Sequence, residues 1–239
     1  MGKGKINLPS VLTKDTWFYK DRPENQHRLK HLLGQPYISY SSIDSWFNYR
    51  ADFIKQKFAK IELPQGIYGE FGTWCGEALE NGFFSQENPY GFEGQQNMNL
   101  KVLRPEGALY EKMVVIECEE YFIIGFIDVW TKGEKGVWCR DQKTGGKLKE
   151  SKYSDKEYIQ LILYAYAEEL LGEIIEGIDV YFIRREGSHV RPPLKISKEQ
   201  FVIPLDYNKE RVDFALKKVN QAVEEISDLY TTYLKIFKQ

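Results

Sequence analysis

The hydrophobic pattern of the chain predicts three helices before residue 173. Residues 41–58 place apolar side chains near helical spacing, with Ser41 or Ser42 as the N-cap. A second helix is predicted over residues 70–84. A third is predicted over residues 154–172, because Ser154 can cap it, Glu157 completes a capping box and Gly172 ends it.

The remaining apolar runs predict strands and one long helix. Stretches rich in β-branched and aromatic residues predict strands over 112–120, 121–130, 136–144, 177–186 and 200–205. From Asn208 onward the apolar residues follow a 4-3-4-3 spacing, which predicts an amphipathic helix that docks on the protein's own core rather than in a coiled coil. The order of these elements predicts an α/β fold with a mixed central sheet flanked by helices.

Composition narrows the class of protein. The 239 residues are enough for one large domain, taken as 39–239 with an N-terminal arm over 1–38. No apolar run is long enough to cross a membrane. Three scattered cysteines and three histidines predict a reducing compartment, here the cytoplasm, and argue against a disulfide framework, a structural zinc or an iron–sulfur cluster. The net charge of -2 restricts any nucleic-acid binding to a local basic patch.

One predicted hairpin carries unusual chemistry. If the sequence GEKG at 133–136 forms the turn, residues that pair across it have numbers that add up to 269. Asp128 and Asp141 satisfy this rule and would face each other directly. At about 5 Å and an effective dielectric constant near 20, their repulsion costs on the order of 3 kcal/mol. A divalent cation between them is the simplest way to offset that cost.

The same hairpin brings an ammonium group to these carboxylates. Side chains alternate along a strand, so Asp141 and Lys143 share one face and Asp128 joins them. Two carboxylates suit Mg²⁺ or Mn²⁺, and Lys143 could act on a water molecule or on a phosphate charge. The alternative is an ordinary solvated hairpin, because Asp and Lys are common there and a one-residue slip separates the pair.

Three motifs in this order resemble a known family. The stretches GFID, CRDQKTG and YIQLILYAYA resemble the RecB-like branch of the PD-(D/E)XK nuclease superfamily, in which G-x-x-D is followed by D-x-K-T and then by a helix with Q-L-x-x-Y. The likeness covers roughly residues 39–185 and is more specific than any one motif. It is carried by Gly125, Asp128, Asp141, Lys143, Thr144, Gln160, Leu161 and Tyr164.

The resemblance implies a restriction-endonuclease-like core and assigns roles to the site. The implied metal ligands are Asp128, Asp141 and the backbone carbonyl of Gln142, with Lys143 as a catalytic group. Gln160 and Tyr164, four residues apart on one helix face, would position substrate or solvent.

The chain departs from the family pattern at two places. The entry helix lacks the family's cysteine, which indicates the cluster-free form. In the stretch FGTWCGEALENG, the family's histidine ligand corresponds to Gly76. Glu77 is the natural substitute for this ligand, and a surface charge on the helix is the equal alternative.

Basic residues near the hairpin are candidate DNA contacts. Lys147, Lys149 and Lys152 follow the proposed metal site in one loop, and Arg184 and Arg185 end a predicted strand. All five could bind phosphates, although each is also compatible with a solvated surface.

These residues predict a metal-dependent deoxyribonuclease that uses Mg²⁺ or Mn²⁺ and acts on DNA. An exonuclease of recombination, repair or phage DNA processing is favoured, with recombination or repair proteins as further partners. The first alternative is a structure-specific or site-specific endonuclease. The second is a DNA-binding or assembly module that keeps the fold without catalysis, and it is suggested by Gly76.

Overall fold

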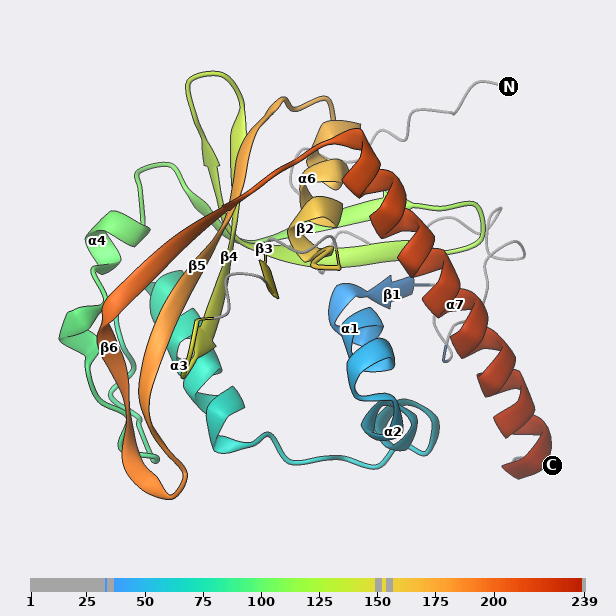
Figure 1. The fold of residues 1–239 in the computed structure, drawn as a ribbon, viewed down its shortest axis with the longest axis horizontal. Coiled ribbons are helices and arrows are strands. Elements are labelled where there is room, and N and C mark those ends of the chain that lie inside the picture. The colour runs from blue at the N-terminus through green and yellow to red at the C-terminus, as the bar shows by residue number, and fades with distance from the viewer. Residues whose placement is uncertain (1–32, 34–36, 149–151, 154–156, 238–239) are drawn as a thin grey trace.

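The computed structural model describes residue 33 and residues 37–148, 152–153 and 157–237. Within this part, six strands form one mixed sheet (Figure 1). The strands are β1 (Tyr37–Ser39), β2 (Leu109–Glu117), β3 (Phe122–Lys132), β4 (Val137–Gly145), β5 (Ile175–Ser188) and β6 (Arg191–Leu205). Their order is β1-β3-β4-β5-β6, and β2 pairs with β3. β1 and β3 are parallel, as are β4 and β5, whereas the other pairs are antiparallel.

Helices cover both faces of this sheet. They are α1 (Tyr40–Asn48), α2 (Arg50–Phe53), the π-helix η3 (Ile54–Phe58), α3 (Ile67–Asn81), the 3-10 helix η4 (Gln95–Asn97), α4 (Leu100–Leu103), α6 (Gln160–Leu170) and α7 (Lys209–Phe237). Helices α1, α6 and α7 lie on one side of the sheet, and α3 and α4 lie on the other (Figure 1). The predicted fold class, a mixed sheet flanked by helices, is confirmed.

The larger core lies between the sheet and α1, α6 and α7. It includes fully buried aromatic side chains of Trp46, Phe53 and Phe58, and burial of each such side chain contributes roughly 1.5–3 kcal/mol. Helix α7 buries Val219 and Ile226 in the same core, so its apolar stripe docks on the protein itself, as the spacing predicted. A second core packs α3 against the opposite side of the sheet.

Helix boundaries differ from the sequence predictions where local capping decides them. α1 begins at Tyr40, because the side chain of Ser39, not Ser41 or Ser42, accepts a hydrogen bond from the Ser42 N–H. The single helix predicted over 41–58 breaks at Tyr49, whose φ of -140° and ψ of 45° are not helical.

The start of α6 also differs from its prediction. The helix begins at Gln160, after an Ile159 that provides no side-chain cap. Glu157 lies before the helix and forms an ion pair with Lys218 at 3.0 Å instead of a capping box, while Ser154 lies outside the described residues. Gly172 does adopt a left-handed φ of 95° just after the helix, as its role at the end of the helix requires.

Two residues of the predicted N-terminal arm belong to the sheet. The arm predicted over 1–38 includes Tyr37 and Ile38, but both residues belong to β1 and pair with β3. Ile38 is buried in the larger core. No helix in the described part of the chain is long and apolar enough to cross a membrane.

Candidate active site

The predicted hairpin register is present in the structure. All four residue pairs between β3 and β4, from Val129–Arg140 to Lys132–Val137, have numbers that add up to 269, and the Gly133 N–H donates to the Gly136 carbonyl at 2.8 Å. The ladder stops at Val129 and Arg140, although both strands continue. From there β3 bends away from β4 (Figure 1), so the two strands form a fork whose next residues are Asp128 and Asp141.

At the fork, a side-chain carboxylate accepts a backbone hydrogen bond in place of a carbonyl of the neighbouring strand. The Gln142 N–H donates to Asp128 Oδ2 at 2.5 Å, which ties β4 to the side chain of Asp128 after the strands have separated. An acidic side chain therefore takes a structural position that a backbone carbonyl occupies in a regular antiparallel pair.

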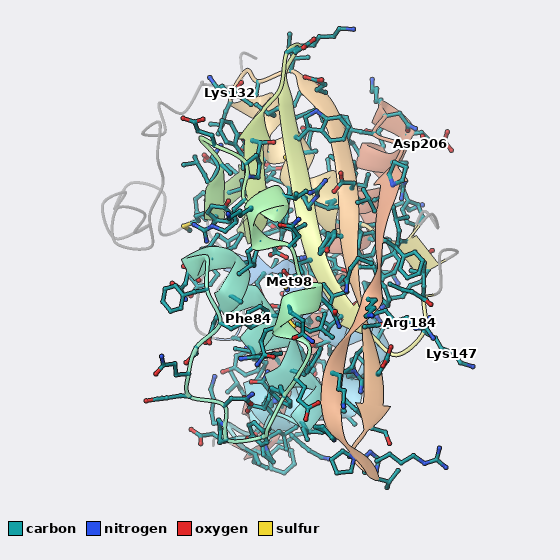
Figure 2. The ribbon with its side chains drawn as sticks, turned by 90° about the vertical axis from the view of Figure 1, so that its left-hand side faces the viewer. Phe84, Met98, Lys132, Lys147, Arg184 and Asp206 are labelled. Carbon is teal, nitrogen blue, oxygen red and sulfur yellow. The ribbon has the colours of Figure 1, made fainter. Side chains whose placement is uncertain are left out.

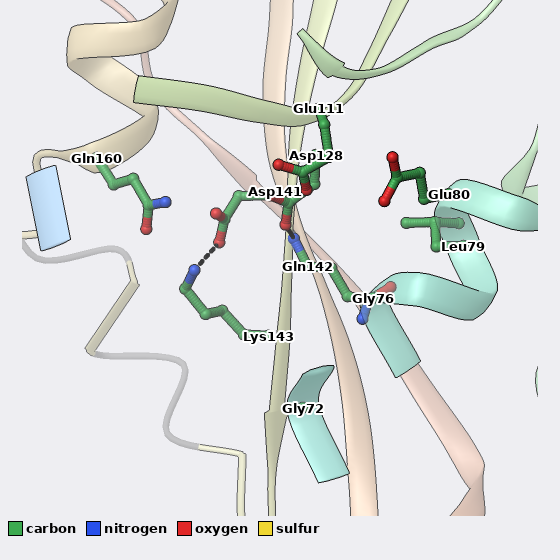
Figure 3. Close-up of a pocket in the computed structure, with 10 residues that line it drawn as sticks. All are labelled: Gly72, Gly76, Leu79, Glu80, Glu111, Asp128, Asp141, Gln142, Lys143 and Gln160. Atoms are coloured by element: carbon green, nitrogen blue, oxygen red, sulfur yellow. Dashed lines mark hydrogen bonds and ion pairs between the residues drawn. The ribbon is translucent and has the colours of Figure 1, made fainter. Parts of the chain in front are cut away.

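A pocket of about 240 Å³ opens at this fork (Figure 3). The two acidic residues and the lysine that the sequence singled out all line it, together with side chains from β2, α3 and α6. Its lining consists of Gly72, Gly76, Leu79, Glu80, Glu111, Asp128, Asp141, Gln142, Lys143 and Gln160. The structure therefore brings Asp128, Asp141 and Lys143 into one pocket, as the hairpin pairing predicted.

The two oxygens of Asp141 have different surroundings. Oδ2 receives the Lys143 ammonium at 2.6 Å and the Tyr158 hydroxyl at 2.9 Å. Oδ1 is buried and has no hydrogen-bond partner among the described residues. A buried carboxylate oxygen without a partner is costly, and in this pocket Oδ1 could accept a hydrogen bond from a water molecule or bind a cation.

Burial and neighbouring charges set the protonation of the site. Burial raises the pKa of Asp128 to about 8, the charge of Asp141 adds to this rise, and Lys143 and the Gln142 N–H oppose it. For Lys143, burial acts to lower the pKa, but the charges of Asp141 and Asp128 outweigh it and the pKa is raised. Lys143 is therefore a cation at neutral pH, and Asp128 is poised to ionise when a positive ligand arrives.

Gln160 and Tyr164 are close together, but only one of them lines the pocket. Gln160 is buried and its Nε2 donates to the Tyr164 hydroxyl at 3.3 Å. The Tyr164 ring lies against Gly125, where an added Cβ would be only 2.0 Å from ring atom Cε1. Tyr164 thus holds the Gln160 side chain in place through this hydrogen bond. Gly125, which has no side chain, leaves room for the Tyr164 ring.

Helix α3 does not bring Glu77 to the pocket. Gly76 lines the pocket, and an added Cβ there would meet no atom within 4 Å. Glu77 is exposed, because one residue turns a helix by about 100° and points the next side chain elsewhere. Glu80, one turn after Gly76 on the same face, does line the pocket. The acidic residue of this helix that faces the site is therefore Glu80.

Two further site residues were missed by sequence reasoning. Glu111 lies between the pairs Tyr110–Val129 and Lys112–Ile127, level with Asp128, with a positive φ of 49°. The sequence would have predicted that Glu111 lies opposite Asp128 if the length of the β2–β3 connection had been known, because that length sets the register of the two strands. Nothing in the residue types distinguishes Tyr158 from the other tyrosines, because only the fold brings its hydroxyl to Asp141.

The candidate DNA contacts differ in their surroundings. Arg184 forms an ion pair with Glu199, and Lys147 is exposed beside it (Figure 2), next to the Gly145–Arg184 pair of β4 and β5. Lys152 is exposed, with its ammonium 5.6 Å from the Tyr153 ring. Arg185 packs on Tyr68, and Lys149 lies outside the described residues.

The donor set suits a hard cation with few protein ligands. Among the described residues, no group of three or more His, Cys, Asp or Glu side chains is placed to hold a metal ion. Asp128 and Asp141 both line the pocket, and Asp141 Oδ1 is buried without a hydrogen-bond partner among the described residues. Mg²⁺ is commonly bound by one or two carboxylates and several waters, so these residues fit it.

Replacing Asp128 with Asn is expected to stabilise the metal-free protein at neutral pH. The pKa of Asp128 in the folded protein lies above its ordinary value of 3.8, so its contribution to stability is complete below about pH 4 and is lost as pH rises through about 8. At about 1.4 kcal/mol per pKa unit, the loss is on the order of a few kcal/mol. Urea unfolding in EDTA at several pH values measures it.

The Asn variant retains an acceptor for the Gln142 N–H, so it removes the charge without removing the hydrogen bond. The stability difference between the two proteins should therefore grow from pH 4 to pH 8. The same dependence on pH in both proteins would show that Asp128 is not strained by its surroundings.

Known structures resemble the fold, whereas sequence comparisons are silent. No family model matches the chain, and no curated protein matches it in sequence. A crystal structure from Eubacterium rectale, of a protein named "putative exonuclease", covers 93% of this chain and 87% of its own, with a TM-score of 0.55 and 13% identity. At this identity the likeness concerns the fold alone. The crystal structure of SSO0001 covers 77% of this chain and 76% of its own at 15% identity, with a TM-score of 0.42, which is too low to support an argument.

Proposed function

We propose that this protein is a metal-dependent DNA nuclease, and that Mg²⁺ or Mn²⁺ binds between Asp128 and Asp141. The single observation that carries the proposal is the fork pocket, in which two facing carboxylates, one buried oxygen without a partner and one ammonium converge. A cation bound there would activate a water molecule and stabilise the charge that develops on a phosphate.

Residues of the protein would supply the other groups that the reaction needs. The Asp141 carboxylate holds the Lys143 ammonium at 2.6 Å, so the lysine enters the reaction as a fixed positive charge near the attacked phosphate. Its raised pKa favours this electrostatic role over removal of a proton from water. Gln160 supplies an amide in the wall of the pocket, and Tyr164 positions it. Gln142 would add its backbone carbonyl as an oxygen ligand.

Removal of nucleotides from DNA ends is the favoured reaction. The name of the E. rectale protein agrees with this choice, and recombination, repair or phage DNA processing is the setting that the motif resemblance implies. An endonuclease is the alternative within the same chemistry. An inactive binding module is disfavoured by the pocket, because Asp128, Asp141 and Lys143 all line it.

We expect the purified protein to degrade end-labelled linear DNA in Mg²⁺ or Mn²⁺ and to leave it intact in EDTA. Single-stranded, double-stranded and covalently closed circular DNA should be compared. Circular DNA has no end, so an exonuclease leaves it uncut and an endonuclease converts it to linear products.

The Lys143→Ala variant is the control for this assay, because it removes the ammonium that pairs with Asp141 and keeps both carboxylates in the protein. Cleavage that persists in EDTA, or equal rates in the variant and the wild type, would overturn the proposed mechanism. Binding of DNA without cleavage in either cation would support the inactive module instead.

A further inference from the structure

A second cluster of side chains lies beside the candidate active site, at the start of α3. Tyr68 is its centre. The guanidinium carbon of Arg185 lies 3.8 Å from the centroid of the Tyr68 ring, and the Tyr68 hydroxyl lies 3.0 Å from His189 Nδ1. The His189 backbone N–H also donates to this hydroxyl at 3.3 Å. One exposed ring thus joins α3 to the β5–β6 hairpin.

Arg185 differs from two other cations of this hairpin. Arg184 is paired with Glu199, and Lys195 is paired with Glu93 at 2.7 Å. No ion pair links Arg185 to a carboxylate in the described part of the chain, and its Nη1 is buried without a hydrogen-bond partner there. Its charge is therefore not neutralised by an acidic side chain. The Tyr68 side chain remains 40% exposed although Arg185 packs on its ring.

The cluster lies on the same face of α3 as the pocket. Tyr68, Gly72 and Gly76 are four residues apart, so they lie on one face of α3, and the last two line the pocket. At about 1.5 Å per residue, Tyr68 lies roughly 12 Å along the helix from Gly76. On the sheet, Arg185 lies four residues beyond Tyr181, the partner of the pocket residue Gln142, which is about 13 Å along the same face.

The surface between Tyr68 and the pocket carries opposite charges at its two ends. Arg185 and the exposed Lys147 lie at the Tyr68 end, whereas Glu80 and Glu111 line the pocket near the end of α3. A polyanion is attracted to the first end and repelled from the second. A strand that reaches the pocket would therefore extend toward Tyr68 rather than beyond Glu80.

We propose that Tyr68 and Arg185 bind single-stranded DNA next to the cleavage site, with a base stacked on Tyr68 and a phosphate near Arg185. This inference rests on the proposed nuclease function and adds the substrate form to it. An aromatic ring beside an arginine is a common platform for unpaired bases, because every base has a π-face and the backbone is anionic. A base-paired duplex hides those faces, so the cluster favours a single strand or a frayed end.

A purely structural role predicts a different pattern of mutant effects. If Tyr68 only anchors the hairpin, it does so through its hydroxyl, which bonds to His189, and through its ring, on which Arg185 packs. Tyr68→Phe removes both hydrogen bonds and keeps the ring, whereas Tyr68→Ala removes the ring as well. A structural role therefore predicts equal losses of single-strand and duplex binding in Tyr68→Ala, whereas stacking predicts a loss for the single strand alone.

The test measures binding of a 5′-labelled single-stranded oligonucleotide and of its blunt duplex by fluorescence anisotropy. The Lys143→Ala background in Mg²⁺ keeps the probe intact. We expect Tyr68→Ala and Arg185→Ala each to weaken single-strand binding about tenfold, and Tyr68→Phe to stay within about twofold. In the otherwise unmodified enzyme, Tyr68→Ala should raise KM for single strands and leave kcat within about twofold.

Tyr90→Ala is the matched control, because Tyr90 is 46% exposed and stacks on Phe92, with ring centroids 5.3 Å apart, and does not line the pocket. It should bind DNA like the parent protein. Unchanged binding in Tyr68→Ala and Arg185→Ala, or an equal loss in Tyr68→Phe and Tyr68→Ala, would overturn this inference alone if the wild type cleaves DNA. A wild type that neither binds nor cleaves DNA would overturn the nuclease function together with it.

Discussion

Replacing Asp141 with Asn is expected to reduce DNA cleavage by about a thousandfold, which corresponds to about 4 kcal/mol of transition-state stabilisation. The two carboxylate oxygens of Asp141 serve different partners, because Oδ2 holds Lys143 and Tyr158 whereas Oδ1 is left open to the cation. An asparagine has only one oxygen. Its NH₂ group must therefore face either the Lys143 ammonium or the incoming cation, and both arrangements are repulsive.

Two measurements separate this effect from a loss of folding. Cleavage of end-labelled DNA in Mg²⁺ gives kcat/KM, and calorimetric titration with Mn²⁺ reports cation binding directly. Asp179→Asn is the matched control, because Asp179 is buried on the neighbouring strand and pairs with Arg140 at 2.5 Å outside the pocket. Its variant should lose stability and keep cation binding. If Asp141→Asn bound Mn²⁺ as tightly as the wild type, the cation would lie elsewhere.

Replacing Gly125 with Ala is expected to destabilise the fold by about 3 kcal/mol or more. The added Cβ would lie 2.0 Å from Cε1 and 2.6 Å from Cζ of Tyr164, far inside the contact distance of two carbon atoms. The ring cannot move aside easily, because Tyr164 is buried in the larger core and its hydroxyl accepts a hydrogen bond from Gln160. Overpacking of this kind costs about 1–3 kcal/mol and sometimes more.

A double-mutant cycle assigns this cost to the ring. Gly125→Ala should cost less than about 1 kcal/mol in a Tyr164→Ala background, because the clashing atoms are then absent. Gly76→Ala is the control: its Cβ meets nothing within 4 Å, and alanine in a helix interior is favoured by roughly 0.5–1 kcal/mol. Chemical denaturation of the four proteins measures the cycle. Equal costs in both backgrounds would mean that backbone conformation, not the ring, requires glycine.

The sequence was most informative where a local rule fixes geometry. The turn at 133–136 sets the register of β3 and β4, so counting alone gave the four pairs up to Val129–Arg140, with Asp128 and Asp141 next in line where the ladder ends. Helical spacing likewise gave the buried face of α7. The mixed sheet with flanking helices followed from the order of strand and helix patterns, although the three-residue β1 left no recognisable pattern.

Features that depend on distant segments could not be read in this way. Glu80 and Glu77 have similar local patterns, and only the docking of α3 selects Glu80 for the pocket. The hydrogen bond from Tyr158 to Asp141 depends on how the chain enters α6, where the capping pattern suggested a helix start six residues too early. Contacts between Tyr68 and the β5–β6 hairpin join positions 121 residues apart.

The hydrogen bond from the Gln142 N–H to Asp128 links the proposed chemistry to the architecture, because one side chain both holds two strands together and lines the pocket. Proteins that descend from this chain and lose the proposed activity should therefore still be restricted in the residue at position 128. Those that keep an oxygen acceptor there retain the junction, whereas an aliphatic replacement leaves a main-chain donor unsatisfied at a cost of about 1–3 kcal/mol. We therefore expect an inactive relative to carry an amide or a hydroxyl side chain at the position of Asp128.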